Sequence, residues 1–144
     1  MLVLKFDYNK TGARPTPAFP RQHHVLRPII PINLVLAGRL VKTVALIDSG
    51  ADWSIFHAEL GEILGLDVRA GDEQDFYGIV GSDPGTIYFH DISVEIGGIA
   101  YPMRCGFSYD ISPNGIAVLG QYGFFDTFEV SFKRTKKRVE LKES

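Results

Sequence analysis

A carboxylate stands where an apolar segment of the chain ends and a turn begins. Residues 43–47 have the sequence TVALI, and Asp48, Ser49 and Gly50 follow directly. A continuous apolar run of this kind is typical of a buried strand. Asp and Ser favour turns and glycine permits positive φ, so the triplet alone predicts only a strand end. After a core strand, however, it would hold a carboxylate rigidly, as general acid–base catalysis requires.

Other kinds of site have less support in the sequence. Ser49 lacks the G-x-S-x-G context of a serine nucleophile, and no base for it is identifiable. His23 and His24 are adjacent, with no second His/Cys pair at metal-ligand spacing. We interpret them as loop residues and expect no metal and no cofactor. The glycines within residues 78–85 lack the spacing and the lysine of a P-loop.

Length and composition predict one compact domain. The chain has 144 residues, of which 45% are hydrophobic, which is enough for a core and argues against disorder. The net charge of −2 argues against a dedicated nucleic-acid or membrane-surface protein. The run of basic residues at 133–138 lies between two apolar segments. We interpret it as a solvated hairpin turn and expect no nucleic-acid partner.

Cysteine content and the length of apolar segments bear on the compartment. Cys105 is the single cysteine, so no internal disulfide can form, which fits a reducing compartment. We interpret it as a small buried hydrophobic residue. Residues 1–10 become charged too soon for a signal peptide, and no stretch approaches the length of a membrane span. We therefore expect a cytoplasmic protein without a membrane partner.

Most of the chain has the pattern of short strands separated by glycine and turn residues. Strands are expected at residues 2–8, 29–36 and 43–47, and several more between residue 75 and the C-terminus. Gly38 marks a turn after the second of them, and Gly97-Gly98 marks a tight turn. Residues 11–22 carry three prolines and are expected to form a loop or an extended arm. This pattern indicates a small barrel or sandwich with one helix attached.

The best helix candidate is the segment 54–66. Ser54 is placed to cap its start, and Gly65 is placed to end it. The apolar residues of one predicted face are Phe56, Leu60, Ile63 and Leu64.

Three segments occur in a recognisable order: ALIDSGAD at 45–52, FYGIVGSDPGTIYF at 76–89 and IAVLG at 116–120. They resemble the active-site segment, the flap hairpin and the second signature of the retropepsins, the retroviral-type (clan AA) aspartic proteases. GQYGFFDTFEVSF at 120–132 resembles the C-terminal segment of the bacterial single-domain members. The resemblance extends from about residue 28 to the C-terminus.

The resemblance implies an all-β fold: a small closed retropepsin-like β-barrel with a flap hairpin and one or two short helices. It divides the chain into residues 1–27, an N-terminal strand and proline-rich arm, and residues 28–144, the protease domain. The second signature is expected to cross behind the catalytic loop and to precede a short helix. Its residues here are Val118, Leu119 and Gly120.

The resemblance also implies an activity, that of an aspartic endopeptidase acting on peptides or proteins. The D-[ST]-G triplet occurs once in this chain, so an active enzyme requires a homodimer in which Asp48 faces its mate. Two close carboxylates share one proton. The charged one would activate a water, and the protonated one would polarise the scissile carbonyl.

Further roles follow from position in the family's motifs. Ser49 is expected to lock the two catalytic loops together, and Gly50 to offer its carbonyl to substrate. Ala51 and Asp52 are expected to line the cleft. The flap residues expected to close over substrate are Gly78, Ile79, Val80 and Gly81.

One departure from the family pattern keeps other interpretations open. Many retropepsins have an Arg after the second signature, which can pair with the Asp that follows D-T-G-A, whereas this chain has Gln121. A hydrogen bond from Gln121 to Asp52 would be weaker than a bidentate Arg contact. The chain is then either a peptidase or a non-catalytic retropepsin-like module for peptide binding or assembly. A third possibility is a monomer whose residues 1–27 cover the cleft until they are removed.

Overall fold

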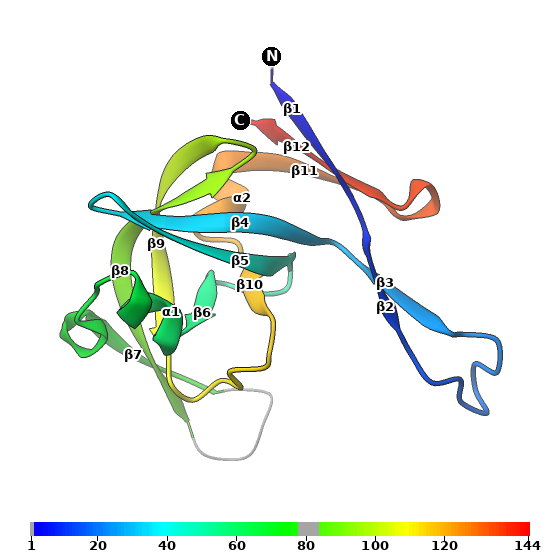
Figure 1. The fold of residues 1–144 in the computed structure, drawn as a ribbon, viewed down its shortest axis with the longest axis horizontal. Helices are drawn as coiled ribbons and strands as arrows, with labels where there is room; N and C mark the ends of the chain where they lie inside the picture. Colours follow the sequence, from blue (N-terminus) through cyan, green and yellow to red (C-terminus); the bar gives the residue numbers. More distant parts are fainter. Residues whose placement is uncertain (1, 78–83) are drawn as a thin grey trace.

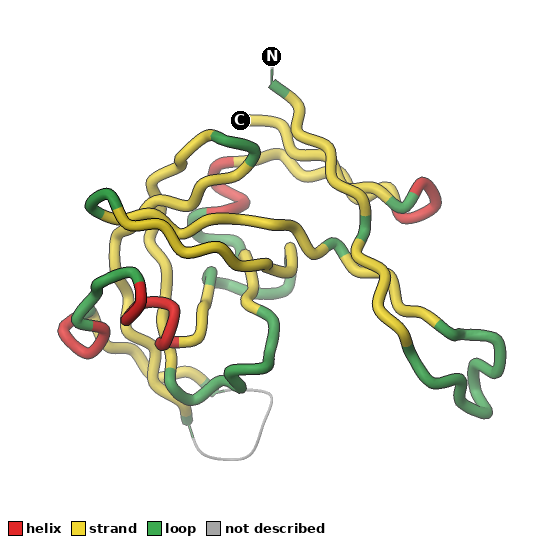
Figure 2. The backbone as a smooth tube through the Cα atoms, viewed as in Figure 1, coloured by secondary structure: helices red, strands yellow, loops and turns green. Residues whose placement is uncertain are grey.

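The computed structural model describes residues 2–77 and 84–144, and most of their regular structure is β-strand (Figures 1 and 2). The all-β class is therefore confirmed. The strands are β1 (Val3–Asp7), β2 (Asn9–Gly12), β3 (His24–Arg27), β4 (Ile29–Leu36), β5 (Arg39–Ile47), β6 (Ile55–His57), β7 (Asp72–Phe76), β8 (Gly85–Ile96), β9 (Ile99–Ser108), β10 (Ala117–Leu119), β11 (Phe128–Lys133) and β12 (Arg138–Glu143). The helices are α1 (Ala58–Ile63) and α2 (Phe124–Thr127), with 3₁₀ turns η1 (Val68–Ala70) and η2 (Arg134–Lys136).

The body of the molecule is one seven-stranded sheet with the order β4-β5-β10-β6-β9-β8-β7. Strand β8 also pairs with β4, which is the first strand in that order. The pairings β5–β10 and β6–β9 are parallel, and they place β10 and β6 at the centre of the order. The apolar side chains enclosed by these strands form the core, with Phe56, Phe107 and Leu119 fully buried.

Strand β4 shows how the sequence produces this arrangement. Ile30, Ile32 and Leu34 lie on one face by the alternation of a strand, and all three are buried in the core. Pro31, between them, is exposed. The predicted strand 29–36 is confirmed, and the predicted strand 43–47 is the end of the longer β5.

Glycine-containing turns join the hairpins where the sequence predicts them. Gly38 (φ 79°) lies between β4 and β5, and Gly97 (φ 60°) and Gly98 (φ 85°) lie between β8 and β9. Positive φ at both central residues suits the tight turns that match the twist of a hairpin. The basic run at 133–138 is also a hairpin connection, since η2 joins β11 to β12.

Two smaller sheets involve the chain ends. β1, β12 and β11 form a three-stranded sheet in that order. β2 and β3 form a separate hairpin that extends away from the body, with residues 13–23 at its tip (Figure 1). His23 lies in that connection, as predicted, whereas the prediction is wrong for His24, which begins β3.

The prediction of a helix over 54–66 is only partly right. Residues 55–57 form β6, and α1 covers Ala58–Ile63. His57, not Ser54, is the N-cap: its Nδ1 accepts a hydrogen bond from the Glu59 N–H at 3.1 Å. Pairing of β6 with β9 and β10 outweighs the helical pattern of the first residues. Ile63, predicted on the apolar face, is 63% exposed.

Cys105 is fully buried in β9, as predicted. Burial raises the pKa of its thiol from 9.0 to about 12. The thiol therefore stays protonated at neutral pH and is unreactive in the folded chain.

A side-chain hydrogen bond ties the C-terminal sheet to the body. The Tyr101 hydroxyl of β9 donates to Glu143 Oε1 of β12 at 2.6 Å. Burial, and then the nearby Glu143 carboxylate, raise the pKa of Tyr101 from 10.0 to about 12. The folded chain thus retains a proton that the unfolded chain loses above about pH 10.

Stability should therefore fall as the pH rises from about 10 to about 12, and Tyr101→Phe should reduce that fall. The tyrosine contribution is complete below pH 10 and is lost as Tyr101 ionises. Urea unfolding at several pH values measures it. Tyr122→Phe, at a tyrosine that is 65% exposed, is the matched control. If the free energy of unfolding falls with pH as steeply in Tyr101→Phe as in the wild type, the assignment is contradicted. Cys105 is present in all three proteins, so its contribution to this fall is the same in each.

Candidate active site

Asp48 follows the last residue of β5, at the edge of the core. Ile47 is buried and Asp48 is half-buried, so the carboxylate is reachable from solvent. Two backbone hydrogen bonds fix this position: the Ile47 N–H donates to the Pro28 carbonyl and the Asp48 N–H to the Leu119 carbonyl, both at 3.0 Å. The sequence prediction that a core strand delivers Asp48 to a rigid turn is consistent with these contacts.

Hydrogen bonds within the turn after β5 hold the Asp48 carboxylate in place. Asp48 Oδ1 accepts a hydrogen bond from the Gly50 N–H at 2.9 Å, and the Ala51 N–H donates to the Asp48 carbonyl at 3.2 Å. A Cβ at position 50 would lie 3.3 Å from Asp48 Oδ1, so the carboxylate packs tightly against the glycine. Ser49, Gly50 and Asp52 are exposed, and Ala51 is half-buried. The loop therefore presents its polar groups to solvent.

The second signature lies directly behind this loop. In β10, Val118 and Leu119 pair in parallel with Leu46 and Ile47 of β5. Gly120 follows in so narrow a space that a Cβ there would lie 2.4 Å from the Trp53 carbonyl oxygen and 2.7 Å from that of Ala51. A side chain at position 120 would thus push the loop away.

Ser54 is a component of the site that the sequence did not reveal. It is fully buried, and its Oγ accepts a hydrogen bond from the Gly120 N–H at 3.1 Å. Its carbonyl accepts from the Gly106 N–H of β9 at 2.8 Å. Ser54 therefore closes the loop onto β10 and β9. The sequence gives no signal for this bond, because its partner is 66 residues away.

The sequence left the partner of Asp52 open and allowed a weak bond from Gln121, but Gln121 contacts other residues of the loop. Its Nε2 donates to the Ser49 carbonyl at 2.7 Å, and its backbone N–H donates to the Ala51 carbonyl at 2.8 Å. The proposed side-chain bond from Gln121 to Asp52 is not among the hydrogen bonds of residues 2–77 and 84–144. The Tyr122 N–H donates to the Asp52 carbonyl at 2.8 Å. Gln121 therefore braces the turn itself.

The segment that resembles a flap, residues 76–89, begins at the last residue of β7 and ends within β8. β7 and β8 are antiparallel, with Phe76 opposite Gly85. Phe76 lies over this glycine, since a Cβ there would meet its ring at 2.5 Å. The four residues predicted to close over substrate lie outside the described residues: Gly78, Ile79, Val80 and Gly81.

A hydrogen-bond network fixes the start of β8 to the end of β9. The Ser108 Oγ donates to the Thr86 carbonyl at 2.7 Å and accepts from the Asp110 N–H at 3.1 Å. Asp110 Oδ2 accepts from the Thr86 N–H at 2.8 Å. Ser108 is fully buried. The base of the β7–β8 hairpin is thus a rigid support, and neither side chain was singled out by the sequence.

The short helix predicted after the second signature is α2. Gly123 N–H donates to Asp126 Oδ2 at 3.0 Å, and the Thr127 hydroxyl donates to the Gly123 carbonyl at 2.7 Å. Phe124 of this helix is fully buried in the core. The helix α2 is therefore held by hydrogen bonds to Gly123 and by the burial of Phe124.

In residues 2–77 and 84–144, no group of three or more His, Cys, Asp or Glu side chains could hold a metal ion. Among those residues, no helix is long and apolar enough to cross a membrane.

Comparison with known proteins identifies the fold. No family model and no curated protein sequence matches the chain. A solved structure, described as a retropepsin-like aspartic protease from Rickettsia conorii, matches with a TM-score of 0.62 at 15% identity, covering 98% of this chain and 99% of that one. EIAV protease, complexed with the inhibitor HBY-793, matches with a TM-score of 0.45 at 18% identity, covering 66% and 82%. The chain has the retropepsin-like fold.

The space behind the loop gives a test of the site's construction. Gly120→Ala should lower the free energy of unfolding by about 1–3 kcal/mol, because its Cβ would overlap two carbonyl oxygens. Urea unfolding measures the change. Gly12→Ala is the matched control, since nothing lies within 4 Å of a Cβ at position 12. Equal stability of both variants would show that Gly120 does not constrain the loop.

Proposed function

We propose that the chain is an aspartic endopeptidase that acts as a homodimer. The observation that carries the proposal is the placement of Asp48: a half-buried carboxylate at the end of a core strand, held by the Gly50 N–H and backed by Gly120. The retropepsin-like fold supports it. We assign the activity to residues 28–144; residues 1–27 form the N-terminal strand and arm, and their strand β1 pairs with β12.

Each chain supplies one candidate catalytic carboxylate, so the proposed mechanism requires a second copy of the chain. The D-S-G triplet occurs once, so a pair of aspartates requires two chains related by a two-fold axis. The exposure of Ser49 and Gly50 supports an approach of two loops, because nothing in the described part of the chain buries them. Gln121 and Ser54 hold each loop in shape before the copies meet. The loops would therefore pay little conformational entropy on association.

The chemistry follows from two carboxylates that share one proton. Their mutual repulsion keeps the second proton in place, so the pair contains a base and an acid at once. The charged Asp48 takes a proton from a water, whose oxygen attacks the scissile carbonyl carbon. The protonated Asp48 of the other copy donates a hydrogen bond to the carbonyl oxygen. When the tetrahedral intermediate collapses, the amine leaves with a proton from the pair.

The remaining residues position the substrate. Gly50 offers its carbonyl to the peptide main chain, and Ala51 and Asp52 line the cleft beside it. Ser49 links the two loops across the axis. The proposed flap, Gly78, Ile79, Val80 and Gly81, would exclude water and add backbone hydrogen bonds to an extended peptide.

Asp48→Asn should abolish peptidase activity while the chain stays folded, because an amide cannot serve as the base. A loss of at least about 10²-fold is expected for removal of general acid–base catalysis. An unfolded protein substrate, incubated between about pH 3 and about pH 7 and followed by mass spectrometry, measures cleavage. Asp67→Asn, at an exposed carboxylate without a capping bond, is the matched control. Equal activity in Asp48→Asn and wild type would exclude this mechanism.

The oligomeric state is a separate prediction. Sedimentation at micromolar concentration should give about twice the 16.0 kDa mass of one chain, because a dyad needs two copies. A chain that cleaves substrate as a monomer contradicts the shared dyad. A folded dimer that cleaves nothing across the pH range contradicts the peptidase assignment and favours a module that binds peptides or assembles partners.

A further inference from the structure

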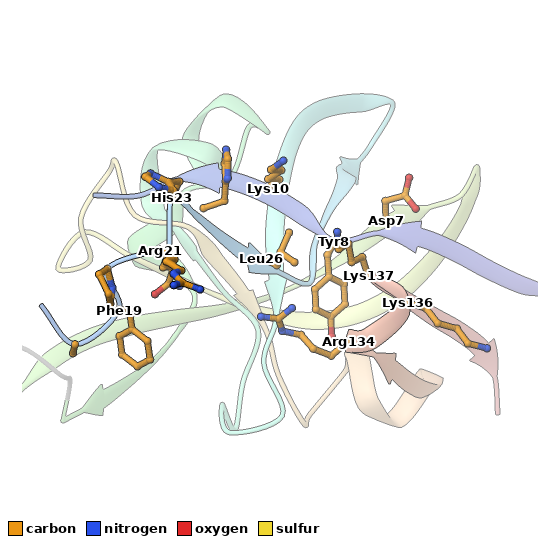
Figure 3. A pocket seen from close by; sticks show the side chains of 14 residues that line it. Asp7, Tyr8, Lys10, Phe19, Arg21, His23, Leu26, Arg134, Lys136 and Lys137 are labelled. Atoms are coloured by element: carbon orange, nitrogen blue, oxygen red, sulfur yellow. The ribbon is translucent and has the colours of Figure 1, made fainter. Parts of the chain in front are cut away.

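A cleft lies outside the candidate active site. It has a volume of about 1260 Å³ and separates the β2–β3 hairpin with its tip from the β11–β12 turn (Figure 3). Residues far apart in the sequence line it, from Asp7–Leu26 on one side and Arg134–Lys137 on the other. We refer to it as the basic cleft.

Positive charge is concentrated around the basic cleft. Residues 9–27 and 133–138 together contain nine of the chain's fifteen Lys and Arg residues and none of its seventeen Asp and Glu residues. The fold brings these two segments together, although the sequence separates them by more than a hundred residues. The cations that line the cleft are Lys10, Arg21, Arg134, Lys136 and Lys137, with the imidazoles of His23 and His24.

These cations lack the carboxylate partners that neutralise their neighbours. Lys133 and Arg138, at the ends of the basic run, pair with Glu140 at 3.1 and 2.8 Å. In the described part of the chain, no ion pair involves the five cations of the cleft. Asp7 is the single acidic residue in the lining. An anionic ligand would relieve the resulting repulsion.

Backbone contacts hold the two walls in place. The Tyr8 N–H donates to the carbonyl of Lys137 at 2.8 Å, which joins the base of the hairpin to the basic turn. Lys137 has a left-handed backbone (φ 55°), so the turn has a defined shape. The Ala13 N–H donates to the His23 carbonyl at 2.8 Å and continues the β2–β3 ladder toward the tip. The charges are thus presented by folded segments.

Apolar groups lie among the charges. Lys10 pairs with Leu26 across the hairpin, and Tyr8, between β1 and β2, lines the same cleft. Tyr8 and Leu26 are half-buried, and Phe19 at the tip is 64% exposed. The cleft therefore offers apolar contact and positive charge side by side.

We propose that the basic cleft binds an acidic polypeptide segment in which carboxylates alternate with apolar side chains. Such a segment matches both the cations and the apolar groups of the lining. A nucleic acid matches less well, because a long polyanion would extend onto the remainder of the chain, which carries all seventeen acidic residues. No binding activity of this kind follows from the proposed peptidase chemistry.

One backbone hydrogen bond connects the chain segment that follows the cleft to the candidate active site. Pro28, the residue after β3, accepts the hydrogen bond of the Ile47 N–H, one residue before Asp48. If the proposed function holds, binding of an acidic segment in the cleft raises the local concentration, near Asp48, of the substrate polypeptide that carries this segment. This role rests on the proposed function, whereas binding itself does not.

Direct binding tests the proposal. The probe is a fluorescein-labelled decapeptide in which Glu alternates with Leu or Val, titrated with the Asp48→Asn variant of residues 1–144 so that cleavage cannot interfere. Fluorescence anisotropy should show saturable binding that weakens as salt is raised. The same peptide with Gln in place of Glu should bind at least tenfold more weakly. Equal affinity of the two peptides, or no saturable binding of either, overturns the proposal.

Charge reversal locates the site. Arg134→Glu with Lys136→Glu should weaken peptide binding about tenfold, since each reversal replaces an attraction with a repulsion. Arg39→Glu with Lys42→Glu makes the same charge change on the exposed β4–β5 hairpin, and should change affinity less than about twofold. Circular dichroism checks that both variants fold. Equal loss in the two variants overturns the assignment to the cleft.

Two other occupants give different results. A single-stranded oligonucleotide of equal charge that binds the cleft more tightly than the Glu peptide would show a nucleic-acid site, and the proposal fails. A change in sedimentation mass for Arg134→Glu with Lys136→Glu, without a loss of peptide binding, would show that a second copy occupies the cleft, and the proposal also fails. Loss of peptide binding with unchanged mass supports it, whatever the outcome of the cleavage assay.

Discussion

The site depends on one constraint: the backbone of residues 119–122 passes immediately behind the loop 48–54. Five hydrogen bonds join these segments: three between backbone groups, one from the Gly120 N–H to the Ser54 hydroxyl and one from Gln121 Nε2 to the Ser49 carbonyl. The contact is possible only because position 120 has no side chain. Buried polar groups of this kind are costly to leave unpaired, so the loop has little freedom to take another shape. The position of Asp48 is therefore determined by a segment about seventy residues away.

The sequence predicted the features that depend on local pattern. The apolar segment 29–36 located β4, paired glycines located the β8–β9 turn, and an apolar run followed by Asp48 located the candidate site. The helix over 54–66 was placed too early, because β6 gains pairing partners on β9 and β10 that its own sequence does not reveal. Ser54 and Ser108 were missed for the same reason: each is polar and buried, and only its distant partners give it a role.

The distribution of charge shows the same limit. The basic run at 133–138 was correctly interpreted as a hairpin turn, yet its location beside the β2–β3 hairpin followed only from the pairing of β1 with β12. That pairing carries the N-terminal segment to the C-terminal sheet and places Tyr8 against Lys137. An overall charge of −2 thus conceals two basic segments that the fold joins. Composition gives only the net charge, whereas recognition depends on how the charged side chains are distributed over the surface.

The buried thiol of Cys105 changes what a single cysteine says about the protein's surroundings. Its side chain is inaccessible and its pKa is raised to about 12, so neither oxidants nor alkylating reagents meet a thiolate in the folded chain. Cys105 therefore gives no evidence for or against a reducing compartment. It is instead an internal reporter of conformational opening, because a thiol reagent modifies this chain only when β9 separates from its neighbours.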